Sequence, residues 1–128
     1  MKDVLAAAAQ ARSRAYAPYS RFRMGAAVRT DRGRIVPGAL VENVSLGLAM
    51  CAERSALFAT VAQDAGRPEV LALVAPRTDG ALTWPCGACL QVALELGGHD
   101  LAVVVSDLTG RSDTARLGDL ARSLPYKR

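Results

Sequence analysis

Apolar and polar positions follow two different spacings along the second half of the chain. Residues 70–75 and 101–106 are apolar at nearly every position, a pattern typical of strands that are buried on both faces of a parallel sheet. Residues 50–65 and 87–96 instead carry small and apolar side chains at helical spacing. Since each helical stretch precedes one of the apolar strands, the pattern predicts an α/β layered domain with a partly parallel sheet.

The first part of the chain is predicted to hold a helix followed by a hairpin. Residues 3–17 have helical composition, and Pro18 disfavours continuation of the helix. Residues 25–30 and 34–40 are expected to be strands, because the turn between them, 31–33, ends in a glycine that tolerates positive φ. Such a hairpin is antiparallel, so the sheet is predicted to be mixed.

The other segments are expected to be loops and one last helix. Little periodicity is present over 38–48, and turn residues gather at 77–81 and 107–110. Residues 114–124 are predicted to form a short final helix. Because no repeat, linker or low-complexity tract divides the sequence, residues 1–128 are interpreted as a single domain.

Charge is the next property that limits the possible partners. The formal net charge of +4 permits nucleic-acid binding, and the closest group of arginines is Arg21, Arg23, Arg29, Arg32 and Arg34. No run of basic residues is interleaved with aromatic residues in the manner of a single-strand binding groove. We therefore expect a solvated basic surface and no nucleic-acid partner.

Targeting signals and cysteine usage indicate a reduced compartment. The alanine-rich segment 5–11 is too short for a membrane span and is soon followed by Arg12, and no secretory cleavage site is recognisable. The chain has three cysteines, an odd number that argues against a disulfide framework. A cytoplasmic location, no membrane contact and free thiols are expected.

The three cysteines have spacing and context suited to a zinc ion. Cys86 and Cys89 form a C-x-x-C where a loop enters a predicted helix, and Cys51 stands at the start of the other predicted helix. A helix N-terminus favours the thiolate that binds metal. Three protein ligands leave one position of tetrahedral zinc open, as catalytic sites do. A structural site would be closed, and the single histidine, His99, is the candidate fourth ligand in that alternative.

Glu53 follows Cys51 by two positions and has two possible interpretations. An acidic residue in the first turn of a helix is favoured by the helix dipole without further function. Beside a zinc-activated water, the same carboxylate can transfer protons as a general acid and base. A redox C-x-x-C would leave Cys51 and Glu53 unexplained, so the combination favours the zinc interpretation.

Four motifs in order resemble those of the small homotetrameric zinc-dependent cytidine deaminases. They are Ala-Pro-Tyr-Ser-Arg-Phe-Arg-Met-Gly-Ala-Ala at 17–27, Val-Glu-Asn at 41–43, Cys-Ala-Glu-Arg at 51–54 and Pro-Cys-Gly-Ala-Cys at 85–89. The resemblance implies a three-layer α/β/α sandwich around a mixed five-stranded sheet. It also implies one zinc ion per subunit, a nucleoside substrate, and a homotetramer whose sites are shared between subunits.

The resemblance further implies the reaction and the residues that carry it. Cys51, Cys86 and Cys89 would hold zinc, and Glu53 would move protons while a zinc-activated hydroxide deaminates cytidine or deoxycytidine. The substrate contacts would come from Phe22 against the pyrimidine, from Glu42 to a ribose hydroxyl and from the backbone at Ala52. Arg54 would donate hydrogen bonds to the zinc-bound thiolates and offset their negative charge.

Four positions depart from the pattern of this family. Leu40 replaces an asparagine that contacts the ribose, so sugar recognition is expected to be weaker or different. Leu46 stands where many relatives carry tyrosine, and Leu90 where arginine is usual. Near the end of the chain, Tyr126 is only a rough counterpart of a phenylalanine that covers an adjacent site.

Leu40 keeps a second substrate open, because a modified cytosine nucleoside such as blasticidin S would suit an altered sugar site. A non-catalytic, zinc-stabilised binding protein of the same fold is an alternative from another class, and it predicts a closed metal site. A nucleic-acid editor is the third alternative. It would need further basic and aromatic elements that the sequence does not show.

Overall fold

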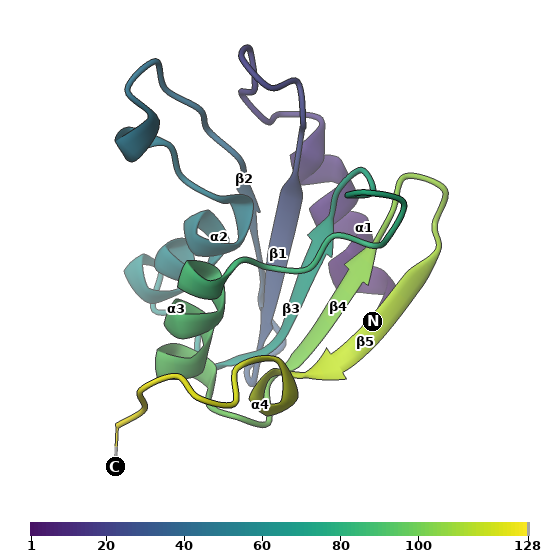
Figure 1. Cartoon of the computed structure of the whole chain (residues 1–128). Coiled ribbons are helices and arrows are strands. Elements are labelled where there is room, and N and C mark those ends of the chain that lie inside the picture. The colour runs from purple at the N-terminus through teal and green to yellow at the C-terminus, as the bar shows by residue number, and fades with distance from the viewer. Residues whose placement is uncertain (128) are drawn as a thin grey trace.

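A mixed five-stranded sheet forms the centre of the molecule (Figure 1). Its strands are β1 (Gly25–Thr30), β2 (Ile35–Ala39), β3 (Pro68–Val74), β4 (Ala102–Ser106) and β5 (Ser112–Arg116), in the order β2-β1-β3-β4-β5. Strands β3 and β4 are parallel, and the other neighbours are antiparallel. The computed structural model describes residues 1–127, and it confirms the mixed sheet of five strands.

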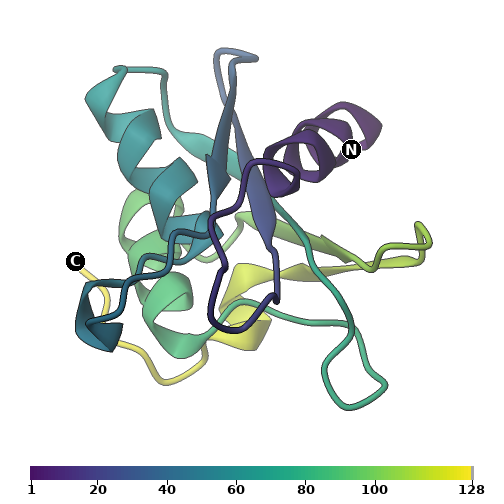
Figure 2. The same cartoon turned by 90° about the horizontal axis from the view of Figure 1, so that it is seen from above.

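Helices cover both faces of this sheet. Helix α1 (Lys2–Arg12) lies on one face, while α2 (Ala52–Ala62) and α3 (Gly87–Gly97) lie side by side on the other, as Figure 2 shows. The short helix α4 (Leu117–Leu120) packs beside α3. The three-layer arrangement is therefore present. Within residues 1–127, no helix is long and apolar enough to cross a bilayer.

The apolar run in β3 supplies two separate cores. Leu71 and Leu73 belong to the core beneath α2 and α3, whereas Val70, Ala72 and Val74 belong to the core beneath α1. Successive side chains of a strand point to opposite faces. A strand covered on both faces must therefore be apolar at every position, which explains why the sequence shows no alternation there.

Two glycines allow the helices to lie close to the sheet. A Cβ atom added at Gly25 would collide with the backbone of α1 at Ala8, and one added at Gly38 would collide with the backbone of α2 at Ala56. Neither glycine has positive φ, so the requirement is steric. The position of α2 relative to the sheet thus depends on the absence of a side chain at Gly38.

The first helix is shorter than predicted, because α1 ends at Arg12 and not at residue 17. Beyond it, Tyr16 pairs with the segment that follows β2: its N–H donates to Leu40 O at 2.9 Å and its carbonyl accepts from Glu42 N at 2.8 Å. Helical composition alone could not reveal this long-range pairing. It brings the loop at 17–24 beside residues 40–42.

The predicted final helix over 114–124 is wrong for its first residues. Ser112–Arg116 forms edge strand β5, and only Leu117–Leu120 is helical. Four of the five β5 residues are exposed, so the strand lacks the apolar alternation by which strands are predicted. It forms because the open edge of β4 offers backbone partners.

Candidate metal centre and active site

The first turns of α2 and α3 hold the three cysteines. Cys51 immediately precedes α2, Cys86 immediately precedes α3, and Cys89 lies in the first turn of α3. Their Sγ atoms all lie within 4.8 Å of one another, and those of Cys86 and Cys89 are 3.6 Å apart. Packing of the two helices on the same face of the sheet therefore joins residues that are 35 positions apart in the sequence.

The sulfur cluster has the dimensions of a zinc site. Zn–S bonds of about 2.3 Å in a tetrahedron hold the sulfurs about 3.8 Å apart, close to the separation of Cys86 and Cys89. Among residues 1–127, these three cysteines are the only group of side chains that could hold a metal ion. The three thiols would thus supply three of the four ligands of a zinc ion.

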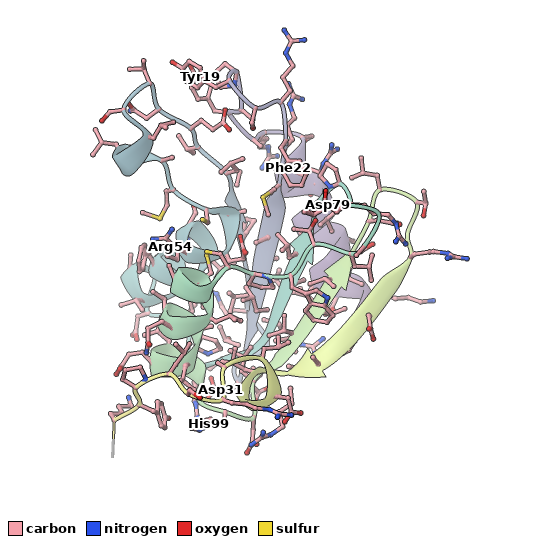
Figure 3. All side chains as sticks on the ribbon, in the orientation of Figure 1. Tyr19, Phe22, Asp31, Arg54, Asp79 and His99 are labelled. Atoms are coloured by element: carbon pink, nitrogen blue, oxygen red, sulfur yellow. The ribbon has the colours of Figure 1, made fainter. Side chains whose placement is uncertain are left out.

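His99 does not join this cluster. It follows α3 at the end opposite Cys86 and Cys89, and its ring meets Tyr126 edge-on with centroids 4.8 Å apart. In Figure 3, His99 is labelled near the bottom of the molecule, well below Arg54. The alternative of a structural zinc site with four protein ligands would require His99 beside the cysteines, and the structure places His99 elsewhere.

Arg54 supplies positive charge to the sulfur cluster. Its Nη2 atom donates to Cys51 Sγ at 3.2 Å. Hydrogen bonds from Cys89 and from Arg54 lower the pKa of Cys51 to about 5, and its hydrogen bond to Cys51, together with burial, raises the pKa of Cys89. The guanidinium of Arg54 therefore favours the thiolate form of Cys51, which is the form that binds a divalent cation.

Glu53 lies within the first turn of α2 and is only 1% exposed. Burial raises the pKa of this carboxyl to about 7, so it can take up and release a proton near neutral pH. Its Oε1 atom has no hydrogen-bond partner among residues 1–127. A buried acidic oxygen without a protein partner is unfavourable unless it serves a ligand.

The predicted substrate-contacting residues come from the first turn of α2 and from the segments around β1 and β2. Ala52, the first residue of α2, is fully buried. Phe22 is half-buried and packs against the core beneath α2 and α3. Leu40 is half-buried after β2, with its N–H bonded to Met24 O at 3.1 Å. The residues around Phe22 and Leu40 therefore lie side by side.

Glu42 is already engaged by the neighbouring loop. Its Oε1 atom accepts from Tyr19 N at 3.0 Å and from Ser20 N at 3.2 Å, and its Oε2 atom accepts from the Ser20 hydroxyl. The Ser20 hydroxyl bond is the leading reason why the pKa of Glu42 is lowered. Glu42 thus has a structural partner that the sequence analysis did not assign.

The end of the chain runs along α3 of the same molecule. Gln91 Nε2 donates to Pro125 O at 2.8 Å, and Tyr126 contacts His99. Within one subunit, Tyr126 therefore lies far from the cysteines.

A family model for the cytidine and deoxycytidylate deaminase zinc-binding region matches residues 1–105. The chain belongs to this deaminase family. It is 48% identical over 96 residues to a cytidine deaminase of Mycobacterium tuberculosis, covering 75% of this chain and 71% of that protein. It is 45% identical over 103 residues to one of Halalkalibacterium halodurans, covering 80% and 76%.

The fold agrees with solved structures of cytidine deaminases. The structure from Burkholderia pseudomallei superimposes with a TM-score of 0.89 at 42% identity, covering 97% of this chain and 98% of that chain. The structure from Bacillus anthracis is only 14% identical but has a TM-score of 0.72, which shows the shared fold alone. The cytidine deaminase-like architecture predicted from the four motifs is confirmed.

Sequence analysis did not assign a role to Ser20 in this deaminase. The residue lies inside the motif at 17–27, two positions before Phe22. The sequence suggested only that a serine in a turn often forms a hydrogen bond with nearby backbone. Its principal partner, Glu42, is 22 residues away, so only the folded chain shows the interaction.

Proposed function

We propose that this chain is a zinc-dependent enzyme that hydrolyses the exocyclic amino group of cytidine or deoxycytidine, releasing ammonia and the uracil nucleoside. The observation that carries the proposal is the buried Glu53 carboxyl beside three clustered thiols. A metal site that served only for stability would gain nothing from burying an unpartnered acid. Membership of the deaminase family and the names of the relatives support the same reaction.

In the proposed mechanism, Cys51, Cys86 and Cys89 hold the metal and Arg54 balances their charge. Zinc bound there supplies Lewis acidity that helps water ionise. Glu53 accepts a proton from the attacking water and delivers it to N3 of the cytosine ring. The new C4–O bond forms, and Glu53 then takes the proton of the C4 hydroxyl and delivers it to the amino nitrogen. The C4–N bond breaks with ammonia as the leaving group, and the C4 oxygen becomes the carbonyl of uracil.

The substrate would be held by residues on the loops above the helices. Phe22 offers an aromatic face to the pyrimidine, and the backbone at Ala52 orients the base. Glu42 Oε2 can accept a second hydrogen bond, and a ribose hydroxyl could donate it. Leu40 can contribute only apolar contact, which supports weaker recognition of the sugar than an asparagine would give.

The proposed assembly is a homotetramer with sites shared between subunits. Three apolar side chains project from the segment after Glu42: Val44, Leu46 and Leu48 are 80%, 82% and 70% exposed. Phe58 and Val61 on the outer side of α2 are exposed as well. Such apolar surface favours association. The cytoplasmic location stays a prediction from the sequence.

A substrate panel tests the function. The zinc-loaded protein is incubated with cytidine, deoxycytidine, cytosine and blasticidin S, and ammonia and products are quantified. We expect turnover of the two ordinary nucleosides and little of free cytosine. Ammonia release from blasticidin S alone would instead support the modified-nucleoside alternative, and no turnover at all would support the zinc-stabilised binding protein.

A further inference from the structure

A hydrogen-bonded cluster connects the loop that carries Phe22 to the segment after β2. Ser20 is its centre: the hydroxyl donates to Glu42 Oε2 and accepts from Phe22 N at 3.0 Å. The N–H groups of Tyr19 and Ser20 both point to Glu42 Oε1. The Glu42 carboxylate thus accepts hydrogen bonds from two backbone amides and one hydroxyl of the loop, and the same hydroxyl accepts one from the amide of Phe22.

The loop conformation between these bonds is strained. Arg21, between Ser20 and Phe22, has φ of 59°, a left-handed conformation that is unfavourable for a side chain with a Cβ atom. Its N–H bonds back to Ala17 O at 3.0 Å. A strained backbone conformation is retained only where surrounding contacts stabilise it, and such conformations are concentrated at ligand-binding sites. At Arg21, the hydrogen bonds of Ser20 and Phe22 on either side provide this stabilisation.

The other end of the cluster is connected to the metal centre. Val41, next to Glu42, exchanges two backbone hydrogen bonds with Met50, at 3.0 and 2.9 Å. Met50 directly precedes Cys51. Hydrogen bonds and the peptide link between Val41 and Glu42 therefore connect the amide of Phe22, through Ser20 and Glu42, to Met50 beside the first candidate metal ligand.

We propose that Ser20 is a positioning residue, which together with Glu42 forms a latch that holds the backbone of Phe22 and thereby sets the position of its ring. This inference rests on the proposed function, because it takes Phe22 as the residue that faces the pyrimidine. The latch gives Glu42 a role toward the base that is separate from any contact with the sugar.

The latch and a purely sugar-binding role for Glu42 predict different substrate dependence. If Glu42 served only the sugar, Ser20 would be incidental, and removal of its hydroxyl would matter little. If the latch positions Phe22, loss of the Ser20 hydroxyl weakens binding of the base. The loss is then the same whether or not the nucleoside carries ribose hydroxyls.

The kinetic test compares cytidine with 2′,3′-dideoxycytidine as substrates. For Ser20→Ala we expect KM to rise roughly tenfold on both substrates, the range expected for one lost hydrogen bond in a connected cluster, with kcat within about threefold of wild type because Glu53 and the cysteines are unchanged. Ser20→Thr keeps a hydroxyl and should recover most of the loss. Ser13→Ala removes another exposed serine, whose hydroxyl bonds only to Gln10 O in its own helix, and should behave as wild type.

A double substitution tests whether the two residues act together. Ser20→Ala added to Glu42→Ala should cause little further rise in KM for dideoxycytidine, since the latch is already open. Zinc content and thermal midpoint are measured for every variant, so that misfolding is recognised. If the rise in KM for dideoxycytidine in the double variant equalled the product of the rises in the two single variants, the latch would be contradicted.

Amide hydrogen exchange gives a readout that needs no activity. In the Ser20→Ala variant, the Phe22 amide loses its acceptor, and we expect its exchange to accelerate at least about tenfold, with smaller increases at Tyr19 and at residue 20. Unchanged exchange, or kinetics like those of Ser13→Ala, would overturn the proposal. If the wild type failed to deaminate cytidine, the proposed function would be wrong, and the exchange data would still decide whether the latch exists.

Discussion

The metal centre and the loops above it differ in how the fold supports them. Glu53 and Cys89 are buried in the first turns of two helices that are packed on the sheet. The loop at 17–24 and the segment at 40–48 are largely exposed and are held together by hydrogen bonds. The candidate chemical groups thus lie on packed helices, whereas most of the predicted substrate contacts lie on exposed segments, where substitution is more easily tolerated.

The departures from the motifs that the chain resembles fall in both regions. Leu40 and Leu46 lie in the segment after β2, whereas Leu90 is half-buried in α3, directly after Cys89. A change in the buried centre would leave an unpaired acid or an incomplete metal site. A change at the rim alters only the contacts with substrate or with a neighbouring subunit.

The largest expected effect is that of Glu53→Gln. The amide cannot accept and return protons, so kcat should fall by roughly a hundred- to ten-thousandfold, while zinc content stays at one ion per chain because the three thiols remain. Single-turnover assays with cytidine and metal analysis measure the two quantities. Unchanged turnover would mean that Glu53 is not the proton carrier.

Gly38→Ala should damage the metal side of the sheet through the position of α2. The added Cβ collides with the backbone at Ala56, so unfolding free energy should fall by roughly 1–3 kcal/mol, and zinc affinity should fall with it. Gly25→Ala is the matched control, because it displaces α1 on the opposite face. Urea unfolding and zinc titration should show equal destabilisation but unchanged zinc affinity for Gly25→Ala. Equal zinc affinity in both variants would contradict the dependence of the centre on α2.

Arg54→Gln should weaken zinc binding while leaving the ligands in place. Without the guanidinium donor to Cys51 Sγ, the pKa of that thiol rises and the thiolates lose charge compensation, so affinity should fall about tenfold. Competition with a chromophoric chelator measures the change. Arg14→Gln makes the same charge change at an exposed position after α1 and should leave zinc affinity unaltered. An equal fall in both would assign the effect to net charge.

The smallest expected effect is that of a substitution at Leu40, in the segment after β2. Leu40→Asn introduces an amide that can bond to a ribose hydroxyl, and KM for cytidine should fall roughly two- to tenfold. KM for 2′,3′-dideoxycytidine should not change, because the hydroxyl is missing. Leu40→Met keeps apolar character and serves as the control. A parallel change on both substrates would show that position 40 acts on the base or on packing.

The candidate metal ligands and the candidate acid could be recognised in the sequence because each pair is local. Cys86 and Cys89 are three positions apart at one helix start, and Cys51 and Glu53 share another. The packing of α2 beside α3 is what brings the two pairs together. Strand β5 was not predictable in this way. Its residues are mostly exposed, and pairing with β4, not side-chain burial, determines its conformation.

By itself, the sequence determined the α/β class, the two doubly buried strands, and which side chains are the candidates for holding the metal and moving protons. These properties depend on residue type and short spacing along one element. Only the tertiary structure decided that His99 lies far from the cysteines, that α2 rests on Gly38, and that Glu42 meets Ser20. Each of these requires two distant segments to come together, and their separation in space depends on how the whole sheet and its helices pack.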